Sequence, residues 1–180
     1  MNIALFGGSF DPPHLGHLAV IHAALAQLDI ECLYVIPAYL NPFKSEFSAP
    51  PRLRFKWLKT ILHDPRVIVS DFEIMQERSV RSIETVTHFQ DKADKIYMII
   101  GADNLPHLRK WHRFDALDSM VTWVVATRKD ARIDTHYLRL NVDMPVSSSA
   151  LRRDCDARWL PSEIRHEIIN FYKELSCKNA

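Results

Sequence analysis

GGSFDPPHLGH, residues 7–17, is the stretch that decides the fold of this chain. It follows the apolar run Ile3–Phe6, which predicts a buried strand, and it leads into residues 15–28, where apolar side chains recur at helical spacing. Glycine N–H groups and a helix N-terminus both favour a bound anion. We therefore expect a phosphate pocket here, with His14 and His17 offering imidazole donors from one face of the helix.

Strand-length apolar runs and helical patterns alternate along the rest of the chain. Strands are expected at Cys32–Ile36, Val67–Ser70, Ile96–Ile100 and Met120–Ala126, and helices at Arg52–Leu62, Ser82–Phe89 and Pro161–Leu175. This alternation predicts one α/β domain over residues 1–180, a Rossmann-like open, mostly parallel sheet with helices on both faces. The most apolar run, Ile96–Ile100, is expected to be a central strand. Ligands of such sheets bind beyond the carboxyl ends of the strands.

Composition excludes several classes of protein. The 180 residues carry a net charge of +1, so no bulk field draws the chain to nucleic acid or to a membrane surface. No apolar run approaches the roughly 20 residues of a membrane span, and the first six residues are too short for a signal peptide. The three cysteines form no C-x-x-C pair, which favours a reducing, cytoplasmic location.

Residues 7–17 lack both the G-x-G-x-x-G fingerprint of dinucleotide folds and the G-K-[ST] of a P-loop. A zinc site is one alternative use of the histidine pair, and it would need distant ligands such as His107 or His112. A surface pair beside an ordinary glycine turn is another. Gly16 leaves the surface between the two histidines free of side-chain bulk. The chain has only four glycines, and all four fall at predicted strand or helix ends that face one crevice.

Three later segments add polar groups to the same predicted edge of the sheet. The serines of Val146–Arg152 can cap a helix or, with the arginine, bind an anion. Ile100–Asp103 ends the central strand, and Asp103 could bind ribose hydroxyls or cap a helix. Trp111 offers a flat face for stacking or packs in the core. In the long loop after the second strand, Lys44 could reach a phosphate or remain a solvated charge.

Together these motifs resemble a known family. The pattern G-x-F-x-x-x-H-x-G-H in residues 8–17 resembles the nucleotidyltransferase superfamily, and Val146–Arg152 resembles its I-S-S-T-x-I-R motif. With Lys44, Ile100–Asp103 and Trp111, the chain is similar along nearly its whole length to the bacterial nicotinate-mononucleotide adenylyltransferases. The resemblance implies adenylyl transfer from ATP to nicotinate mononucleotide, giving deamido-NAD and pyrophosphate, with Mg²⁺ required. Sibling transferases acting on nicotinamide mononucleotide, phosphopantetheine or a cytidylyl substrate, and a non-catalytic nucleotide-binding protein, stay open, as does a homodimer.

The resemblance also assigns roles by position. The catalytic residues would be His14, His17, Lys44 and Arg152; ATP would contact Gly7, Gly8, Ser9, Phe10, Gly16, Gly101, Asp103, Ser147, Ser148 and Ser149; and nicotinate mononucleotide would contact Arg81, Ser82, Trp111 and His112.

The chain departs from the family where the base is bound. The family carries S-Y-T before the helix that binds the nicotinate carboxylate, whereas this chain has Val80-Arg81-Ser82. Ser82 could still cap that helix, and Arg81 could supply the positive charge instead. His112 stands where a tyrosine is common.

Overall fold

The structure, a computed structural model, describes residues 1–127 and 133–178. Its strands are β1 (Asn2–Gly8), β2 (Cys32–Pro37), β3 (Val67–Val69), β4 (Lys95–Gly101), β5 (Thr122–Thr127) and β6 (Leu138–Asn141). They form one sheet in the order β3-β2-β1-β4-β5-β6, and each of these neighbouring pairs is parallel. The chain order reverses between β1 and β4, which makes this the point where such sheets bind ligands.

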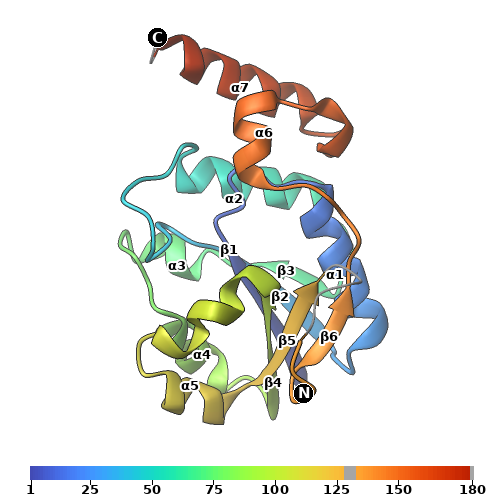
Figure 1. Cartoon of the computed structure of the whole chain (residues 1–180), viewed down its shortest axis with the longest axis vertical. Helices are drawn as coiled ribbons and strands as arrows, with labels where there is room; N and C mark the ends of the chain where they lie inside the picture. Colours follow the sequence, from blue (N-terminus) through green and yellow to red (C-terminus); the bar gives the residue numbers. More distant parts are fainter. Residues whose placement is uncertain (128–132, 179–180) are drawn as a thin grey trace.

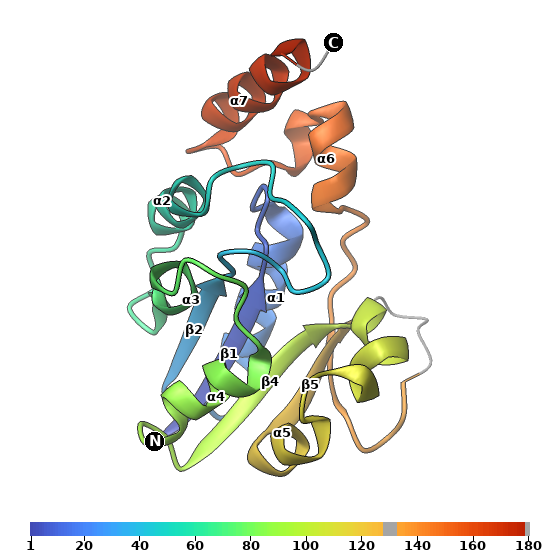
Figure 2. The same cartoon turned by 90° about the vertical axis from the view of Figure 1, so that its left-hand side faces the viewer.

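Helices cover both faces of the sheet (Figure 1). They are α1 (Leu15–Gln27), α2 (Pro51–Ile61), α3 (Phe72–Met75), α4 (Ser82–Gln90), α5 (Phe114–Met120), α6 (Ser148–Asp154) and α7 (Arg165–Lys178), with the 3₁₀ segments η1 (Ala102–Lys110) and η2 (Ala157–Trp159). Figures 1 and 2 show α6 and α7 beyond the end of the sheet that is opposite to the N-terminus, the end toward which the strand arrows point.

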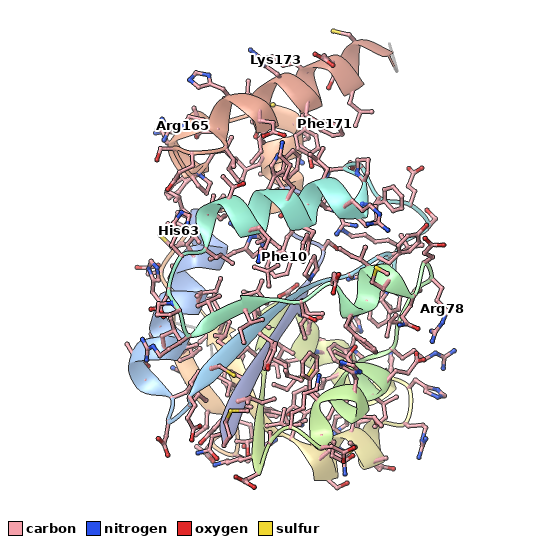
Figure 3. All side chains as sticks on the ribbon, turned by 180° about the vertical axis from the view of Figure 1, so that it is seen from behind. Phe10, His63, Arg78, Arg165, Phe171 and Lys173 are labelled. Atoms are coloured by element: carbon pink, nitrogen blue, oxygen red, sulfur yellow. The ribbon has the colours of Figure 1, made fainter. Side chains whose placement is uncertain are left out.

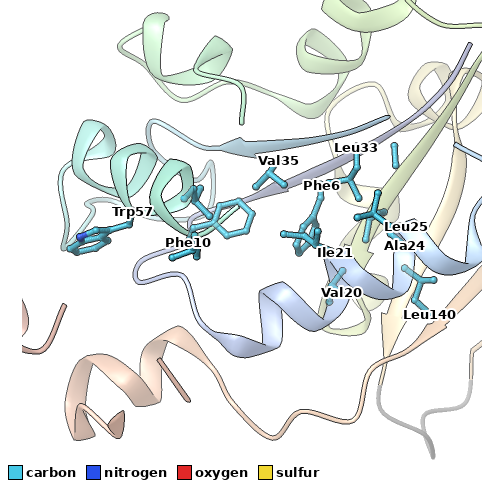
Figure 4. Close-up of a cluster of buried hydrophobic side chains, with 14 of the residues drawn as sticks. Phe6, Phe10, Val20, Ile21, Ala24, Leu25, Leu33, Val35, Trp57 and Leu140 are labelled. Atoms are coloured by element: carbon cyan, nitrogen blue, oxygen red, sulfur yellow. The ribbon is translucent and has the colours of Figure 1, made fainter. Parts of the chain in front are cut away.

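Alternating side chains of the strands build one apolar core on each face. In β1, Ala4 and Phe6 face the core that α1, α2 and α7 cover, whereas Ile3 and Leu5 face the core under α4 and α5. All four are less than a tenth exposed. Figure 4 shows the first of these cores between α1 and the sheet. Near-continuous apolar runs are what a parallel sheet buried on both faces requires.

The sequence predicted strands β1 to β5 and the central position of β4, but it did not predict β6. Two boundaries were wrong. Met120 ends α5 instead of opening β5, and the last helix begins at Arg165 instead of Pro161. Pro161 opens a tight turn in which its carbonyl accepts the N–H of Ile164, 3.3 Å away, and the buried Ile164 then starts the helical bonding.

No helix in residues 1–127 and 133–178 is long and apolar enough to cross a membrane.

Candidate active site

A crevice with two connected lobes lies at the carboxyl ends of β1 and β4. One lobe, of about 670 Å³, is lined by His14 and His17, and we call it the histidine lobe. The other, of about 580 Å³, is lined by Trp111, and we call it the tryptophan lobe. Each volume is typical of a small-molecule site. The residues that line both lobes are Gly7, Gly8, Gly101, Asp103 and Asn104.

The two histidines stack at the start of α1. Their ring centroids are 3.7 Å apart with the planes inclined by 23°. The backbone N–H of His14 donates to Nδ1 of His17 over 3.2 Å. Because this nitrogen accepts, the neutral His17 ring carries its proton on Nε2, which leaves an N–H donor for a ligand. The His14 ring also lines the histidine lobe, and its Nδ1 is buried without a hydrogen-bond partner among the described residues.

Both histidines are neutral at physiological pH. Burial lowers the pKa of His14 to about 4. Burial and, second, the neighbouring His14 ring hold the pKa of His17 well below its usual value. Two stacked imidazoles cannot both carry a charge at low cost.

Gly16 is required where the start of α1 meets the later serine motif. A Cβ atom at this position would lie 2.9 Å from Cγ1 of Val146 and 3.0 Å from the His14 ring. Gly16 thus lines the histidine lobe and also allows Val146 to pack closely against the start of α1.

Residues 146–152 lie against the first motif, as the sequence predicted for two parts of one site. Ser148 Oγ donates to the carbonyl of Pro12 over 2.9 Å, and Arg152 donates to the carbonyl of Asp11 over 2.6 Å. Ser147 caps α6 by accepting the N–H of Ala150. Ser147 and Ser148 line the histidine lobe and Ser149 the tryptophan lobe. The serines thus cap a helix and border the crevice at once.

Lys44 reaches the crevice from the loop after β2. Its Nζ donates to Ser9 Oγ over 3.3 Å, and it lines the tryptophan lobe. Burial and, second, the charge of Arg152 lower the pKa of Lys44. Phe10 lines the histidine lobe, although its ring is only 1% exposed and packs edge-on against His17 at 4.8 Å. Phe10 therefore also supports the His17 ring, and Figure 4 shows it beside α2.

Asp103 lies between the two lobes, directly after β4. It is exposed and falls within the first turn of η1, whereas the cap position of η1 is Gly101. The alternative of a helix-capping Asp103 is therefore wrong. A Cβ at Gly101 would lie 2.3 Å from a carboxylate oxygen of Asp103, so glycine allows the chain to turn here and leaves the carboxylate facing the crevice.

The tryptophan lobe contains all four residues expected to contact the base. Trp111 is half-buried, packs edge-on against Trp123 at 6.0 Å, and has a buried Nε1 without a partner. Trp111 therefore both packs against the core and lines the lobe. Arg81, Ser82 and His112 complete the set. The expectation that Ser82 caps α4 is wrong, because Arg81 occupies the cap position and its N–H donates to Glu84 over 2.9 Å.

The sequence did not reveal Glu73 and Thr85, which also line the tryptophan lobe. Glu73 is 8% exposed and accepts the hydroxyl of Thr85 over 2.7 Å. Burial raises its pKa to about 7, against the opposing effect of the Thr85 hydrogen bond. A glutamate among mixed residues carries no pattern that marks it as buried, so only the packing of α3 on α4 reveals it.

Within residues 1–127 and 133–178, no three His, Cys, Asp or Glu side chains are placed to hold a metal ion. The zinc alternative for the histidine pair therefore finds no further ligands in the described part of the chain.

Comparisons with known proteins place this geometry in context. The sequence model of the cytidylyltransferase-like family matches residues 5–154. A protein of Sulfurimonas denitrificans named "Probable nicotinate-nucleotide adenylyltransferase" is 50% identical, over 98% of this chain and 97% of its own length. A protein of the same name from Campylobacter fetus is 45% identical, over 100% and 99%. Among solved structures, Plasmodium falciparum nicotinic acid mononucleotide adenylyltransferase complexed with NaAD has a TM-score of 0.74 at 17% identity, covering 97% of each chain, which shows the shared fold.

Proposed function

Because the chain belongs to the cytidylyltransferase-like family, and within it to the nicotinate-nucleotide adenylyltransferases, we propose that it joins the adenylyl group of ATP to nicotinate mononucleotide. The products are deamido-NAD and pyrophosphate, and the reaction is a step of NAD biosynthesis.

The observation that carries this proposal is the continuity of the two lobes. A transfer between two nucleotides needs two sites that meet where the bond forms. The histidine lobe offers uncharged donors and a helix N-terminus, which suit the phosphates of ATP. The tryptophan lobe offers a ring for stacking and the exposed Arg81, which suit a pyridine carboxylate. The lobes meet at Gly8 and Gly101, and the reacting phosphates would lie there.

In the proposed mechanism the 5′-phosphate of the mononucleotide attacks the α-phosphorus of ATP in line. A new P–O bond forms, the bond between the α-phosphorus and the bridging oxygen breaks, and pyrophosphate leaves with that electron pair. The attacking oxygen is already anionic, so no general base is needed. Catalysis then rests on positioning and on stabilising charge. We assign this stabilisation to His14, His17, Lys44 and Arg152.

We propose that Mg²⁺ enters bound to the triphosphate of ATP. Mg²⁺ in such sites is usually held by substrate phosphates and water with few protein ligands, and the described residues provide no protein cage for it. A cytoplasmic location is also proposed, because the described cysteines Cys32, Cys155 and Cys177 are all free thiols.

The test is pyrophosphate release from ATP and Mg²⁺ with each acceptor in turn: nicotinate mononucleotide, nicotinamide mononucleotide and phosphopantetheine. We expect rapid release with nicotinate mononucleotide, formation of deamido-NAD, and loss of activity when EDTA removes the metal. Release with phosphopantetheine alone would assign the chain to a sibling reaction. ATP binding without release for any acceptor would support a non-catalytic nucleotide-binding protein.

A further inference from the structure

A buried polar cluster surrounds a residue of the 7–17 segment to which the proposed chemistry gives no role. At its centre is Asp11, which is 2% exposed. Its carboxylate accepts the N–H groups of Ser48 and Ala49, at 2.9 and 3.0 Å, and the hydroxyl of Tyr172. Tyr172 belongs to α7 and is also 2% exposed. A contact from the last helix to the first loop therefore joins residues 161 positions apart.

Arg54 completes the cluster from α2 and is 1% exposed. Its guanidinium donates to four main-chain carbonyls at both ends of the Lys44 loop and in the first loop. The acceptors are the carbonyl oxygens of Ser9 (2.6 Å), Ala38 (2.8 Å), Tyr39 (2.9 Å) and Ala49 (2.9 Å). A fork of fixed geometry with this many partners holds the two loops in one relative position.

Tyr172 is the member that binds this cluster to the rest of the C-terminal region. Burial first, and then the nearby charge of Asp11, raise the pKa of Tyr172 far above any working pH. The hydroxyl therefore stays protonated and remains a donor. Its ring packs on Trp57 and Phe171, at 6.3 and 5.1 Å between centroids. Figure 3 labels Phe171 on α7 above α2 and Phe10 below α2, so α2 lies between α7 and the first loop.

The side chains assigned to phosphate binding belong to segments that are hydrogen-bonded to Asp11 or close to it in the sequence. Lys44 lies in the loop whose end is fixed by Asp11 through Ser48 and Ala49, and Arg152 donates to the main-chain carbonyl of Asp11 itself. His14 follows Asp11 by three residues. A small shift of Asp11 would thus move a lysine, an arginine and a histidine together.

We propose that Tyr172 is a positioning residue: its hydroxyl, acting through Asp11, sets the geometry of the phosphate-binding groups and makes α7 part of the active site. The inference rests on the proposed function. It extends that function past residue 154, where the match to the family model ends.

The test compares Tyr172→Phe with Phe171→Leu. The first removes only the hydroxyl. The second disturbs the packing of the same helix and leaves the bond to Asp11 in place. We expect Y172F to lower kcat about tenfold, the size of effect typical of losing one hydrogen bond to a charged group. The KM for nicotinate mononucleotide should change less than kcat, because Arg81, Ser82 and Trp111, which are expected to contact the base, do not bond to Asp11 or Tyr172. F171L should retain the wild-type kcat, both variants being assayed well below their unfolding temperatures.

A double-mutant cycle with Asp11→Asn separates positioning from general stability. If Tyr172 acts through Asp11, Y172F/D11N should be no slower than D11N alone. Effects that multiply, or equal kcat values in Y172F and F171L, would overturn the proposal. Should Y172F fail to fold, D11N carries the same test, since it must lower kcat by a larger factor than it changes the KM for the mononucleotide.

Failure of the proposed function has a different signature. Wild-type protein that forms no deamido-NAD refutes the reaction. The affinity for ATP, measured by calorimetry in wild type, Y172F and F171L, would then still decide whether Tyr172 positions the phosphate-binding groups.

Discussion

The His17 ring is fixed in one tautomer, and this defines what it can offer a substrate. Nδ1 accepts the N–H of His14, so Nε2 carries the proton. The Phe10 ring packs at its side. A donor held by a backbone bond and an aromatic contact needs no reorganisation when charge develops on a phosphate, and that is where preorganised donors act most strongly.

Substitutions at His17 can distinguish the roles of its two nitrogens. We expect His17→Ala to lower kcat by roughly 10²–10³, the effect of losing one preorganised donor. Glutamine can place an N–H near the position of Nε2, whereas asparagine can replace only the acceptor at Nδ1. His17→Gln should therefore retain more activity than His17→Asn in steady-state assays at saturating substrates. Unchanged turnover in H17A, or the reverse order of the two amides, would contradict the assignment.

Glu73 is a buried titratable residue whose ionisation should make the stability of the protein depend on pH. Its pKa is raised from 4.5 to about 7 by burial, so the folded protein favours the protonated carboxyl. The contribution of this residue is fully present below pH 4.5 and is lost as the pH rises through 7. Over that range the loss is on the order of 3 kcal/mol.

Glu73→Gln should remove this dependence, because the amide stays neutral. Urea unfolding between pH 5 and 8 should show that E73Q gains stability relative to wild type as the pH rises. Thr85→Val is the matched control. It removes the hydroxyl that favours the ionised carboxylate. The pKa of Glu73 should therefore rise further, and the loss of stability should occur at higher pH. Parallel curves for wild type and E73Q would mean that Glu73 is ionised in the folded protein at neutral pH.

At the scale of elements, the start of α1 and residues 146–152, which lead into and form most of α6, depend on each other. Ser148 and Arg152 bond to the loop before α1, and Val146 packs against Gly16. Two motifs about 130 positions apart in the sequence thus form one wall of the histidine lobe. A side chain added at Gly16 must push this wall apart or displace the His14 ring.

Gly16→Ala should therefore damage both stability and activity. Overpacking costs roughly 1–3 kcal/mol, which corresponds to a loss of about 2–4 °C in Tm for each kcal/mol in a protein of this size. Adding Val146→Ala should restore most of the Tm, since it removes the atom at 2.9 Å. It should restore only part of kcat, because the contact with His14 remains. Calorimetry gives the Tm and a steady-state assay gives kcat. If both values in G16A equal those of the wild type, the packing argument is refuted.

The sequence predicted those elements whose pattern lies within their own residues, and it failed where distant residues decide the structure. The alternation of apolar runs and helical patterns located β1, α1 and β4 because their residues carry the pattern themselves. The start of α7 was misplaced, since Pro161 suits a first helical position as well as a turn. The cap of α4 fell on Arg81, a residue type that seldom caps, because Glu84 accepts its N–H. The Asp11, Arg54 and Tyr172 cluster was not predicted, because its partners come from three distant segments.

At the scale of the whole molecule, the sheet order brings two half-sites to one edge. The reversal between β1 and β4 places the loop after β1 beside the turn after β4. Every residue expected at the site except Ser9 and Arg152 lines one of the two lobes. Those two bond to residues beside the lobes: Ser9 accepts a hydrogen bond from Lys44, and Arg152 donates to the carbonyl of Asp11. The sequence predicted which residues belong to the site, but only the three-dimensional structure shows which of them line each lobe.

Because the lobes are separate except at their shared wall, a change in one should affect one substrate. Trp111→Ala should raise the KM for nicotinate mononucleotide roughly tenfold, since a stacked aromatic ring contributes on the order of 1–3 kcal/mol. The KM for ATP should change by less than about twofold, because Trp111 does not line the histidine lobe. Trp111→Phe, which keeps a ring, should lie between wild type and W111A. Deamido-NAD, which would span both lobes, should compete with both substrates in wild type and lose affinity in W111A by the same factor as the mononucleotide. Equal increases in both KM values would show that Trp111 supports the whole crevice through its contact with Trp123 and does not bind the base.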